Sequence, residues 1–469
     1  MSQIHREELK VARERAVLVA VEFPRARLTM DDRMRELDAL VSTAGAKVVG
    51  HLQQRRRLPS GRSFIGKGKL EDLAGLVKMV EATLVIFDHD LTPAQIRNIE
   101  QAACCKIIDR SELILDIFAR RATTHAAKLQ VEIAQLEYTY PRLRAMWDHL
   151  GQVTGGAPVG IGTRGPGEQQ LEIDRRLVQR RLKQLRNELE GILRRKEREV
   201  ASRNEDHFTV GLVGYTNAGK STLFNRVTEG GGAFANDKLF ATLSSRVEKW
   251  DLGSGASVLV SDTVGFIREL PHHLIASFRS TLEETVHGQL LLLVVDVSDH
   301  TAREQLRTVE ETLDAIGAKD QKRILLLNQV DRLERRDELL VWLKDYPDAL
   351  PISAHTGEGL DELKQLVLEC VLGPQQEVVL EVLLKDGQTI DFIERRTEVL
   401  DREYGDATVR YSVRLGRRQV EQMLARGGEG LLDGLPLKDA VERLWPSKAW
   451  SAPVVQGRDG VLDPPEHSP

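Results

Sequence analysis

A glycine-rich loop contains the residues whose types and spacing most clearly predict chemistry. It consists of Gly214, Tyr215, Thr216, Asn217, Ala218, Gly219, Lys220, Ser221 and Thr222. An apolar run at residues 208–213 precedes the loop and predicts a buried strand. In a phosphate-binding loop of this form, backbone N–H groups face phosphate oxygens, Lys220 can reach the β- and γ-phosphates, and the Ser221 hydroxyl can bind Mg²⁺. The loop therefore predicts a bound nucleoside triphosphate.

A second motif has the pattern Asp-x-x-Gly and follows an apolar run at 258–261. Its residues are Asp262, Thr263, Val264 and Gly265. We expect Asp262 to hold Mg²⁺ through water and the Gly265 N–H to approach the γ-phosphate. Between the two motifs, Thr242 is the candidate for closing over Mg²⁺ and the γ-phosphate, which would distinguish a triphosphate from a diphosphate. Lys220, Thr242 and Gly265 are therefore the residues expected to support hydrolysis.

A third motif bears on the choice of base. The apolar run 324–327 ends in Asn328, Gln329, Val330 and Asp331. The Asp331 carboxylate can accept hydrogen bonds from guanine N1–H and the 2-amino group, which adenine does not offer, so ATP would leave it unpaired. After the next apolar run, Ser353 and Ala354 stand where a backbone N–H commonly meets the guanine carbonyl. The motif predicts GTP, although Gln329 replaces the lysine that usually packs over the base.

The residue after Gly265 bears on the hydrolysis rate. Many GTPases have a glutamine there that orients the attacking water, and this sequence has Phe266. We expect slow intrinsic hydrolysis that a partner, a rearranged loop or a monovalent cation accelerates. Asn217 fits the cation, because GTPases that use K⁺ often carry Asn at this loop position. The alternative is that Asn217 only shapes the turn.

Composition limits the class of protein. The 469 residues correspond to about three domains. We expect no membrane span, because no apolar stretch is long enough, and no signal peptide at the N-terminus. Three cysteines form neither a metal-ligand pattern nor a disulfide framework. The net charge of −5 argues against a protein whose whole surface binds nucleic acid. These observations predict a cytoplasmic protein, which we expect to be a monomer.

The first 110 residues predict a small α/β domain. Short apolar runs alternate with helical patterns there, which is typical of a mostly parallel sheet. Gly66, Lys67, Gly68 and Lys69 open one of the helices, at a place where an anion such as the phosphate of ATP can sit. The alternative is a positively charged surface without a nucleotide.

Residues 111–200 predict a helical hairpin. Apolar residues three or four apart indicate a helix from Ser111 to about Leu150 and a second that ends at the GTP-binding domain, and two such helices can pack against each other. The connecting tip, 151–168, is rich in glycine. A bare backbone with one guanidinium can enter a narrow RNA cavity, so we expect RNA contacts from Gly162, Arg164, Gly165 and Gly167. A flexible linker is the alternative.

The remaining chain divides into two folded parts and a tail. Residues 201–373 contain the nucleotide motifs and predict a P-loop GTPase domain with a mostly parallel sheet. Alternating apolar residues around a helix expected at 391–400 predict a small C-terminal α/β domain over 374–449. The tail, 450–469, has the composition of a disordered segment. The fold class is therefore multidomain α/β.

Stretches of sequence beyond the nucleotide motifs make the chain similar to a known family, the HflX family of ribosome-associated GTPases. They lie at 64–69, 109–121, 130–136 with 141–143, 160–172 with 174–176, 262–271 and 278–283. Phe266 fits, since the family has Phe or another apolar residue after Asp-x-x-Gly. Gln329, Gln169 and Ser244-Ser245 depart from it, where Lys, Thr and Asp-Pro are usual.

The resemblance implies a factor that binds the large ribosomal subunit and its RNA in the GTP form. Such a factor inserts the glycine-rich tip toward the peptidyl-transferase centre and splits stalled or idle ribosomes under stress, with hydrolysis controlling its release. The resemblance also implies ATP binding and RNA unwinding at the N-terminal domain. Two alternatives remain: a GTP-dependent factor that only blocks subunit association, and an ATP-driven RNA remodeller.

Overall fold

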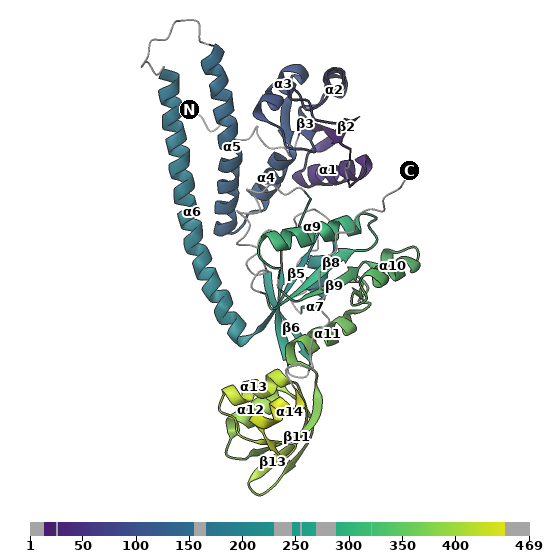
Figure 1. The fold of residues 1–469 in the computed structure, drawn as a ribbon, viewed down its shortest axis with the longest axis vertical. Coiled ribbons are helices and arrows are strands. Elements are labelled where there is room, and N and C mark those ends of the chain that lie inside the picture. The colour runs from purple at the N-terminus through teal and green to yellow at the C-terminus, as the bar shows by residue number, and fades with distance from the viewer. Residues whose placement is uncertain are drawn as a thin grey trace, which may run out of the picture.

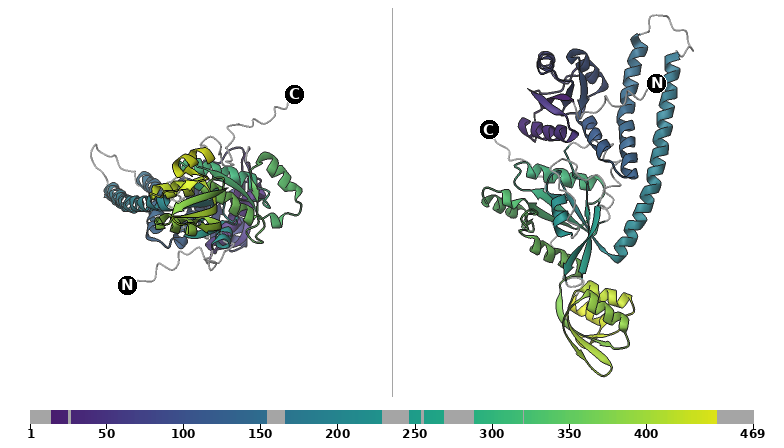
Figure 2. Two further views of the ribbon diagram at one scale, coloured as in Figure 1. Left: turned by 90° about the horizontal axis from the view of Figure 1, so that it is seen from below. Right: turned by 180° about the vertical axis from the view of Figure 1, so that it is seen from behind.

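The computed structural model describes residues 14–24, 27–153, 166–228, 246–253, 256–268, 288–319 and 321–445. Three separate sheets and one long helical hairpin organise these residues (Figure 1). The hairpin and the C-terminal sheet lie toward opposite ends of the molecule, with the GTP-binding sheet between them, and the view from behind agrees (Figure 2). Thr242, Gly162, Arg164, Gly165 and the tail at 450–469 lie outside the described residues.

The N-terminal sheet is parallel and has helices on both faces, as the alternating pattern predicts. Its strand order is β2-β1-β3-β4. The elements are β1 (Arg15–Glu22), α1 (Met30–Ala44), β2 (Lys47–Arg55), α2 (Lys67–Met79), β3 (Leu84–Phe87), α3 (Pro93–Ala103), β4 (Lys106–Asp109) and α4 (Arg110–Arg121). Even-numbered residues of β1 such as Leu18 pack with α1 and α4, and odd-numbered residues such as Val19 pack with α2 and α3.

Helix α1 presents two acidic side chains to the GTP-binding part of the chain. It begins after Thr29, whose hydroxyl accepts a hydrogen bond from the Asp32 N–H, and it ends at Gly45 in the left-handed region, with φ 83°. Asp32 and Glu36 are four residues apart, so they lie on one face of the helix. Their contacts with His300 and Tyr215 show that this face meets the GTP-binding domain.

The hairpin consists of α5 (His125–Val153) and α6 (Pro166–Asp206). The 41 residues of α6 make a rod about 60 Å long. Leu129 and Ile133 of α5 pack with Leu182, Leu185 and Leu189 of α6. The helices extend into both ends of the predicted tip, because α5 continues to Val153 and a proline, which is favoured at a first helical position, starts α6.

The single helix predicted from Ser111 to about Leu150 is wrong, because the structure divides it into α4 and α5. Ala122 after α4 is extended, with ψ 102°. The Thr124 hydroxyl then accepts a hydrogen bond from the Ala127 N–H at 3.2 Å, which caps the start of α5. Apolar periodicity continues across this break, so the sequence pattern alone hides it.

The GTP-binding sheet has the strand order β10-β9-β8-β5-β7-β6, and all pairs are parallel except β6 with β7. Its elements are β5 (Phe208–Gly214), α7 (Lys220–Val227), β6 (Arg246–Gly253), β7 (Ala256–Asp262), β8 (Leu290–Asp296), α9 (Ala302–Ala315), β9 (Arg323–Asn328), η2 (Val330–Arg332), α10 (Asp337–Asp345), β10 (Leu350–Pro351) and α11 (Leu360–Leu372). Strands β5, β7 and β9 therefore end at one edge of the sheet.

The C-terminal sheet has the order β12-β13-β11-β14-β15 and is antiparallel. Its elements are β11 (Gln376–Leu383), α12 (Gly387–Arg396), β12 (Glu398–Tyr404), β13 (Thr408–Leu415), α13 (Arg417–Ala425), β14 (Leu431–Leu432), β15 (Leu435–Pro436) and α14 (Leu437–Leu444). The helix predicted at 391–400 is wrong at its end: Thr397 is extended, and Val399 pairs with Val413 in the sheet.

The predicted multidomain α/β fold is confirmed. The three sheets fall within 1–110, 201–373 and 374–449, and we propose these ranges, with the hairpin at 111–200, as the domains. In the described part of the chain, no helix is both long enough and apolar enough to cross a membrane.

Candidate nucleotide-binding site

The phosphate-binding loop leaves the end of β5 in a tight turn that depends on glycine at two places. A Cβ atom on Gly214 would lie 2.2 Å from the Val294 carbonyl oxygen of the neighbouring strand. Gly219 has φ 91°, in the left-handed region, and a Cβ atom there would lie 2.3 Å from the Asn328 amide nitrogen. Helix α7 begins at the next residue, so its first N–H groups face the inside of the loop.

Lys220 is buried at the start of α7 and lies against the loop. Its ammonium donates to the carbonyl oxygens of Gly214 at 3.0 Å and Tyr215 at 2.6 Å. Burial lowers the pKa of Lys220 to about 8, although the charge of Asp262 opposes this shift. An ammonium has three N–H donors, so Lys220 can bind a phosphate oxygen while two carbonyls hold it in place.

Ser221 and Asp262 form an oxygen-rich pair at the mouth of the loop. The Ser221 hydroxyl donates to Asp262 Oδ2 at 2.8 Å, and Asp262 is fully buried at the end of β7. A hydroxyl beside a carboxylate is a hard donor set that suits Mg²⁺. The geometry is therefore compatible with the magnesium ligands expected from the sequence, except that Thr242 lies outside the described residues.

Residues 262–268, which we call the switch segment, are hydrogen-bonded to the phosphate-binding loop. The Phe266 N–H donates to the Gly214 carbonyl at 3.1 Å, and the Thr216 N–H donates to the Phe266 carbonyl at 2.7 Å. A Cβ atom on Gly265 would lie 2.9 Å from Thr216 Cα, so the segment passes the loop too closely for any other residue. The Phe266 ring is 2% exposed and packs in the core.

The base-recognition motif is built on Asn328, at the end of β9. Its side-chain amide donates to the Ala218 carbonyl at 2.7 Å and accepts from the Ala354 N–H at 3.0 Å. Asn328 thus joins the phosphate-binding loop to the segment at 353–354. The Ser353 hydroxyl donates to Asp331 Oδ1 at 2.6 Å, which orients the Asp331 carboxylate.

Gln329 takes an unusual backbone conformation beside the loop. Its φ is 65°, and its amide donates to the Asn217 carbonyl at 3.3 Å. Arg332 donates in turn to the side-chain amide oxygen Oε1 of Gln329 at 2.6 Å. Asn217 itself has φ 64° and an exposed side chain, which agrees with a role in shaping the turn. Gln329 therefore ties the base motif to the loop through an uncharged amide.

The structure gathers the candidate residues of the described chain at one edge of the sheet. These are the loop at 214–222, residues 262–265, residues 328–331 and residues 353–354. Ligand sites of open α/β sheets lie at this edge, beyond the carboxyl ends of the strands. Gly167 lies away from it, in the first turn of α6.

Comparison with known proteins assigns the chain to a family. Three family models match: a GTP-binding GTPase N-terminal region at 31–119, a GTP-binding GTPase middle region at 121–203, and a 50S ribosome-binding GTPase at 209–329. GTPase HflX of Escherichia coli strain K12 is 42% identical over 384 residues, which cover 80% of this chain and 87% of that protein. GTPase HflX of Lacrimispora saccharolytica is 43% identical and covers 85% of this chain and 92% of that protein.

The chain belongs to the HflX family of GTPases. Its predicted resemblance to this family and its predicted hydrolysis of GTP to GDP and phosphate are therefore confirmed. Among solved structures, it is similar to a GTP-binding protein from Sulfolobus solfataricus in complex with GDP. The two sequences are 24% identical, the match covers 76% of this chain and 98% of that chain, and the TM-score is 0.41.

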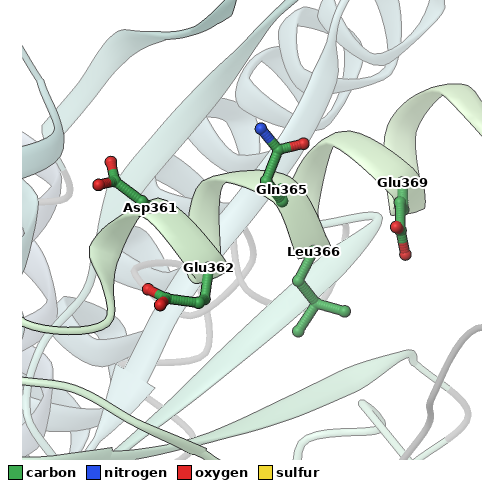
Figure 3. Close-up of a pocket in the computed structure, with 5 residues that line it drawn as sticks. All are labelled: Asp361, Glu362, Gln365, Leu366 and Glu369. Atoms are coloured by element: carbon green, nitrogen blue, oxygen red, sulfur yellow. The ribbon is translucent and has the colours of Figure 1, made fainter.

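A surface depression on α11 does not belong to the HflX nucleotide site. Asp361, Glu362, Gln365, Leu366 and Glu369 line it, and all five project from this one helix (Figure 3). Three carboxylates at one surface repel a phosphate chain. The four motifs remain the candidate nucleotide site.

Sequence reasoning missed the residues that connect this site to the N-terminal domain. Glu36 and Arg110 belong to that domain, yet they contact Tyr215 and Arg268 of the GTPase domain. No motif marks them, because the partners are separated by more than 150 residues. Arg110 follows directly after an apolar strand. A charged residue at such a place is the only feature of the sequence that points to this contact between the domains.

Asn328 offers the first test of the site. We expect Asn328→Ala to lower the affinity for GTP by about tenfold or more, because the loss of its amide leaves the Ala218 carbonyl and the Ala354 N–H unpaired. Titration calorimetry with GTP measures this. Asn98→Ala, which removes a half-buried amide that donates to the Arg62 carbonyl at 2.8 Å in the N-terminal domain, is the matched control. Equal affinities for the two variants would contradict the bridging role.

Proposed function

We propose that this protein binds the large ribosomal subunit in its GTP form and splits stalled or idle ribosomes. In this proposal the glycine-rich tip of the hairpin enters the subunit toward the peptidyl-transferase centre, and GTP hydrolysis controls release. Support comes from the family, since one matching model is described as a 50S ribosome-binding GTPase. We propose that the protein acts in the cytoplasm, as a monomer and under stress.

The observation that carries the proposal is the connection between the hairpin and the nucleotide site. Helix α6 ends at Asp206 and β5 begins at Phe208, so one residue separates the long rod from the strand that carries the phosphate-binding loop. The middle of the rod is stiffened by the apolar contacts of Leu182, Leu185 and Leu189 with α5 and by ion pairs such as Arg181 with Glu132 at 2.7 Å. Force at the far end can therefore reach the nucleotide site through one continuous element.

The proposed roles in the site follow the same logic. Lys220 binds the β- and γ-phosphates, Ser221 and Thr242 bind Mg²⁺, and the Gly265 N–H contacts the γ-phosphate. Mg²⁺ would neutralise the phosphate charge that develops during hydrolysis. Phe266 offers no group that could orient water, so the ribosome accelerates hydrolysis by rearranging the site. We further propose that K⁺ binds at Asn217 and accelerates hydrolysis.

Light scattering of ribosomes separates this function from the two alternatives. Splitting lowers the scattered intensity, so a fall with GTP and with a non-hydrolysable analogue supports splitting, with hydrolysis used for release. Tight binding without any fall supports a factor that only blocks association. A fall in scattered intensity that requires ATP supports an RNA remodeller that binds ATP at the start of α2. At that place the Gly66 N–H donates to the Gln54 side-chain oxygen at 2.9 Å.

Arg164 provides the mutational test of the tip. We expect Arg164→Ala to slow splitting by about tenfold, the effect of losing one hydrogen-bonded charge, while the affinity for GTP stays unchanged. Stopped-flow light scattering measures the rate. Arg164→Lys keeps the charge and removes the planar guanidinium, so it separates simple charge attraction from stacking or bidentate contacts. Undiminished splitting by Arg164→Ala would rule out an active role for this side chain.

A further inference from the structure

The Gln329 side chain connects the base-recognition motif to the phosphate-binding loop. Its Nε2 atom donates to the Asn217 carbonyl oxygen at 3.3 Å. The base is expected at Asp331, two residues further along the chain, and the phosphates are expected in the loop. A side chain that reaches from the motif to the loop therefore runs beside the bound nucleoside, as the lysine usual at this position does.

Arg332 holds the other end of the Gln329 amide. Its Nη1 atom donates to Gln329 Oε1 at 2.6 Å. The two residues belong to one turn, because the Arg332 N–H donates to the Gln329 carbonyl oxygen at 3.0 Å at the start of η2. Hydrogen bonds from charged donors are shorter and stronger than those between neutral groups. The contact with Arg332 is therefore the stronger of the two that hold this amide.

These two partners determine which way the Gln329 amide points. One end of an amide donates and the other accepts, whereas a guanidinium only donates and a carbonyl oxygen only accepts. Only one orientation of the amide therefore satisfies both Arg332 and the Asn217 carbonyl. Without Arg332 the amide could rotate and place its own oxygen against the Asn217 carbonyl oxygen, which would repel it. Arg332 thus keeps the N–H₂ group directed at the loop.

The backbone on either side of the Gln329 side chain is already fixed. Its φ of 65° lies in the left-handed region, which is uncommon for a residue other than glycine. The preceding residue, Asn328, bonds to the phosphate-binding loop, and the Val330 N–H donates to the Ile352 carbonyl oxygen at 3.4 Å. The freedom that remains is that of the side-chain torsions, and the contact with Arg332 restrains these.

Arg332 also brings back a positive charge that Gln329 does not supply. A lysine at position 329 would place an ammonium beside the anionic nucleotide, and Arg332 places a guanidinium one turn further along. Burial raises the pKa of the Asp296 carboxyl at the end of β8, and the charge of Arg332 is among the groups that oppose this rise. The attraction between Asp296 and Arg332 helps to keep the guanidinium at this edge of the sheet.

We propose that Arg332 is a positioning residue for guanine nucleotides: acting through Gln329, it takes over the role of the lysine that this motif usually has. Gln329 provides the donor for the loop, and Arg332 provides the orientation and the charge. The inference rests on the candidate base site at Asp331 and is independent of ribosome splitting. Because GDP and GTP carry the same nucleoside, the pair acts on both nucleotides alike.

Titration calorimetry with GDP and GTP, without ribosomes, tests this role. We expect Arg332→Ala to lower the affinity for both nucleotides about fivefold, the effect of losing one exposed hydrogen bond. Gln329→Lys should rescue this loss, because the lysine reaches the Asn217 carbonyl without help. The affinities of Gln329→Lys/Arg332→Ala should therefore return to within about twofold of wild type. Gln329→Lys alone should bind more weakly than this double variant, because its ammonium is repelled by Arg332.

Arg335→Ala is the matched control. The Arg335 side chain is 75% exposed and pairs with Asp337 at 2.8 Å, so its loss removes the same charge nearby without affecting Gln329. Its affinities should stay within about twofold of wild type. Undiminished affinity in Arg332→Ala, an equal loss in Arg335→Ala, or a failure of Gln329→Lys to rescue Arg332→Ala would each overturn the inference. Asp331→Asn shows whether such a failure extends to the base site, because it weakens GTP binding only if Asp331 contacts the base.

Discussion

Replacing Lys220 with alanine is expected to lower the affinity for GTP by on the order of 100-fold. The Lys220 ammonium is buried between the carbonyl oxygens of Gly214 and Tyr215, and its charge compensates Asp262. The substitution removes the contact to the phosphates, takes one donor from each of the two carbonyls, and removes the positive charge that faces the carboxylate of Asp262. All of these losses weaken the phosphate end of the site.

Fluorescence titration with a labelled GTP analogue in Mg²⁺ buffer measures this affinity. Lys344→Ala, on the exposed surface of α10 in the same domain, controls for a general loss of positive charge. A Lys220→Ala variant that binds the analogue as tightly as Lys344→Ala does would mean that the phosphates bind elsewhere. Ribosome binding should also lose its dependence on GTP in the Lys220 variant.

The nucleotide motifs could be predicted from sequence because each is local. Gly214, Asp262 and Asn328 each end a strand, and the carboxyl ends of parallel strands meet at one edge of the sheet. A short string of residues next to an apolar run therefore determines both the chemistry and the place. Gly214 and Gly219 illustrate this, since the close approaches that demand glycine arise from the loop and the strands beside it.

Contacts between distant segments could not be predicted in this way. Glu36 and Tyr215 are 179 residues apart, and Arg110 and Arg268 are 158 apart. No periodicity links such pairs, because they depend on how two separately folded sheets dock. The break between α4 and α5 was missed for a related reason: a threonine cap and one extended residue decide it, while the apolar pattern continues on both sides.

The predicted recognition of guanine depends on Asp331, and the structure suggests a substitution that tests it. The Ser353 hydroxyl donates to Asp331 Oδ1 at 2.6 Å, so the second carboxylate oxygen can accept from the base. In Asp331→Asn, the same hydroxyl can donate to the amide oxygen, which turns the amide N–H₂ toward the base. Guanine would then meet a donor with its own N–H donors, and the affinity for GTP should fall by on the order of 100-fold.

Xanthosine triphosphate should bind the Asp331→Asn variant more tightly than GTP does. Xanthine carries a carbonyl at the position of the guanine 2-amino group, and this oxygen can accept from the new amide, whereas it would face the carboxylate oxygen of Asp331 in the wild type. Competition of both nucleotides against a labelled analogue measures the reversal. Asp337→Asn, a change at an exposed carboxylate at the start of α10, should leave the preference for GTP intact. If GTP still binds the Asp331 variant better than xanthosine triphosphate does, Asp331 is not the group that reads the base.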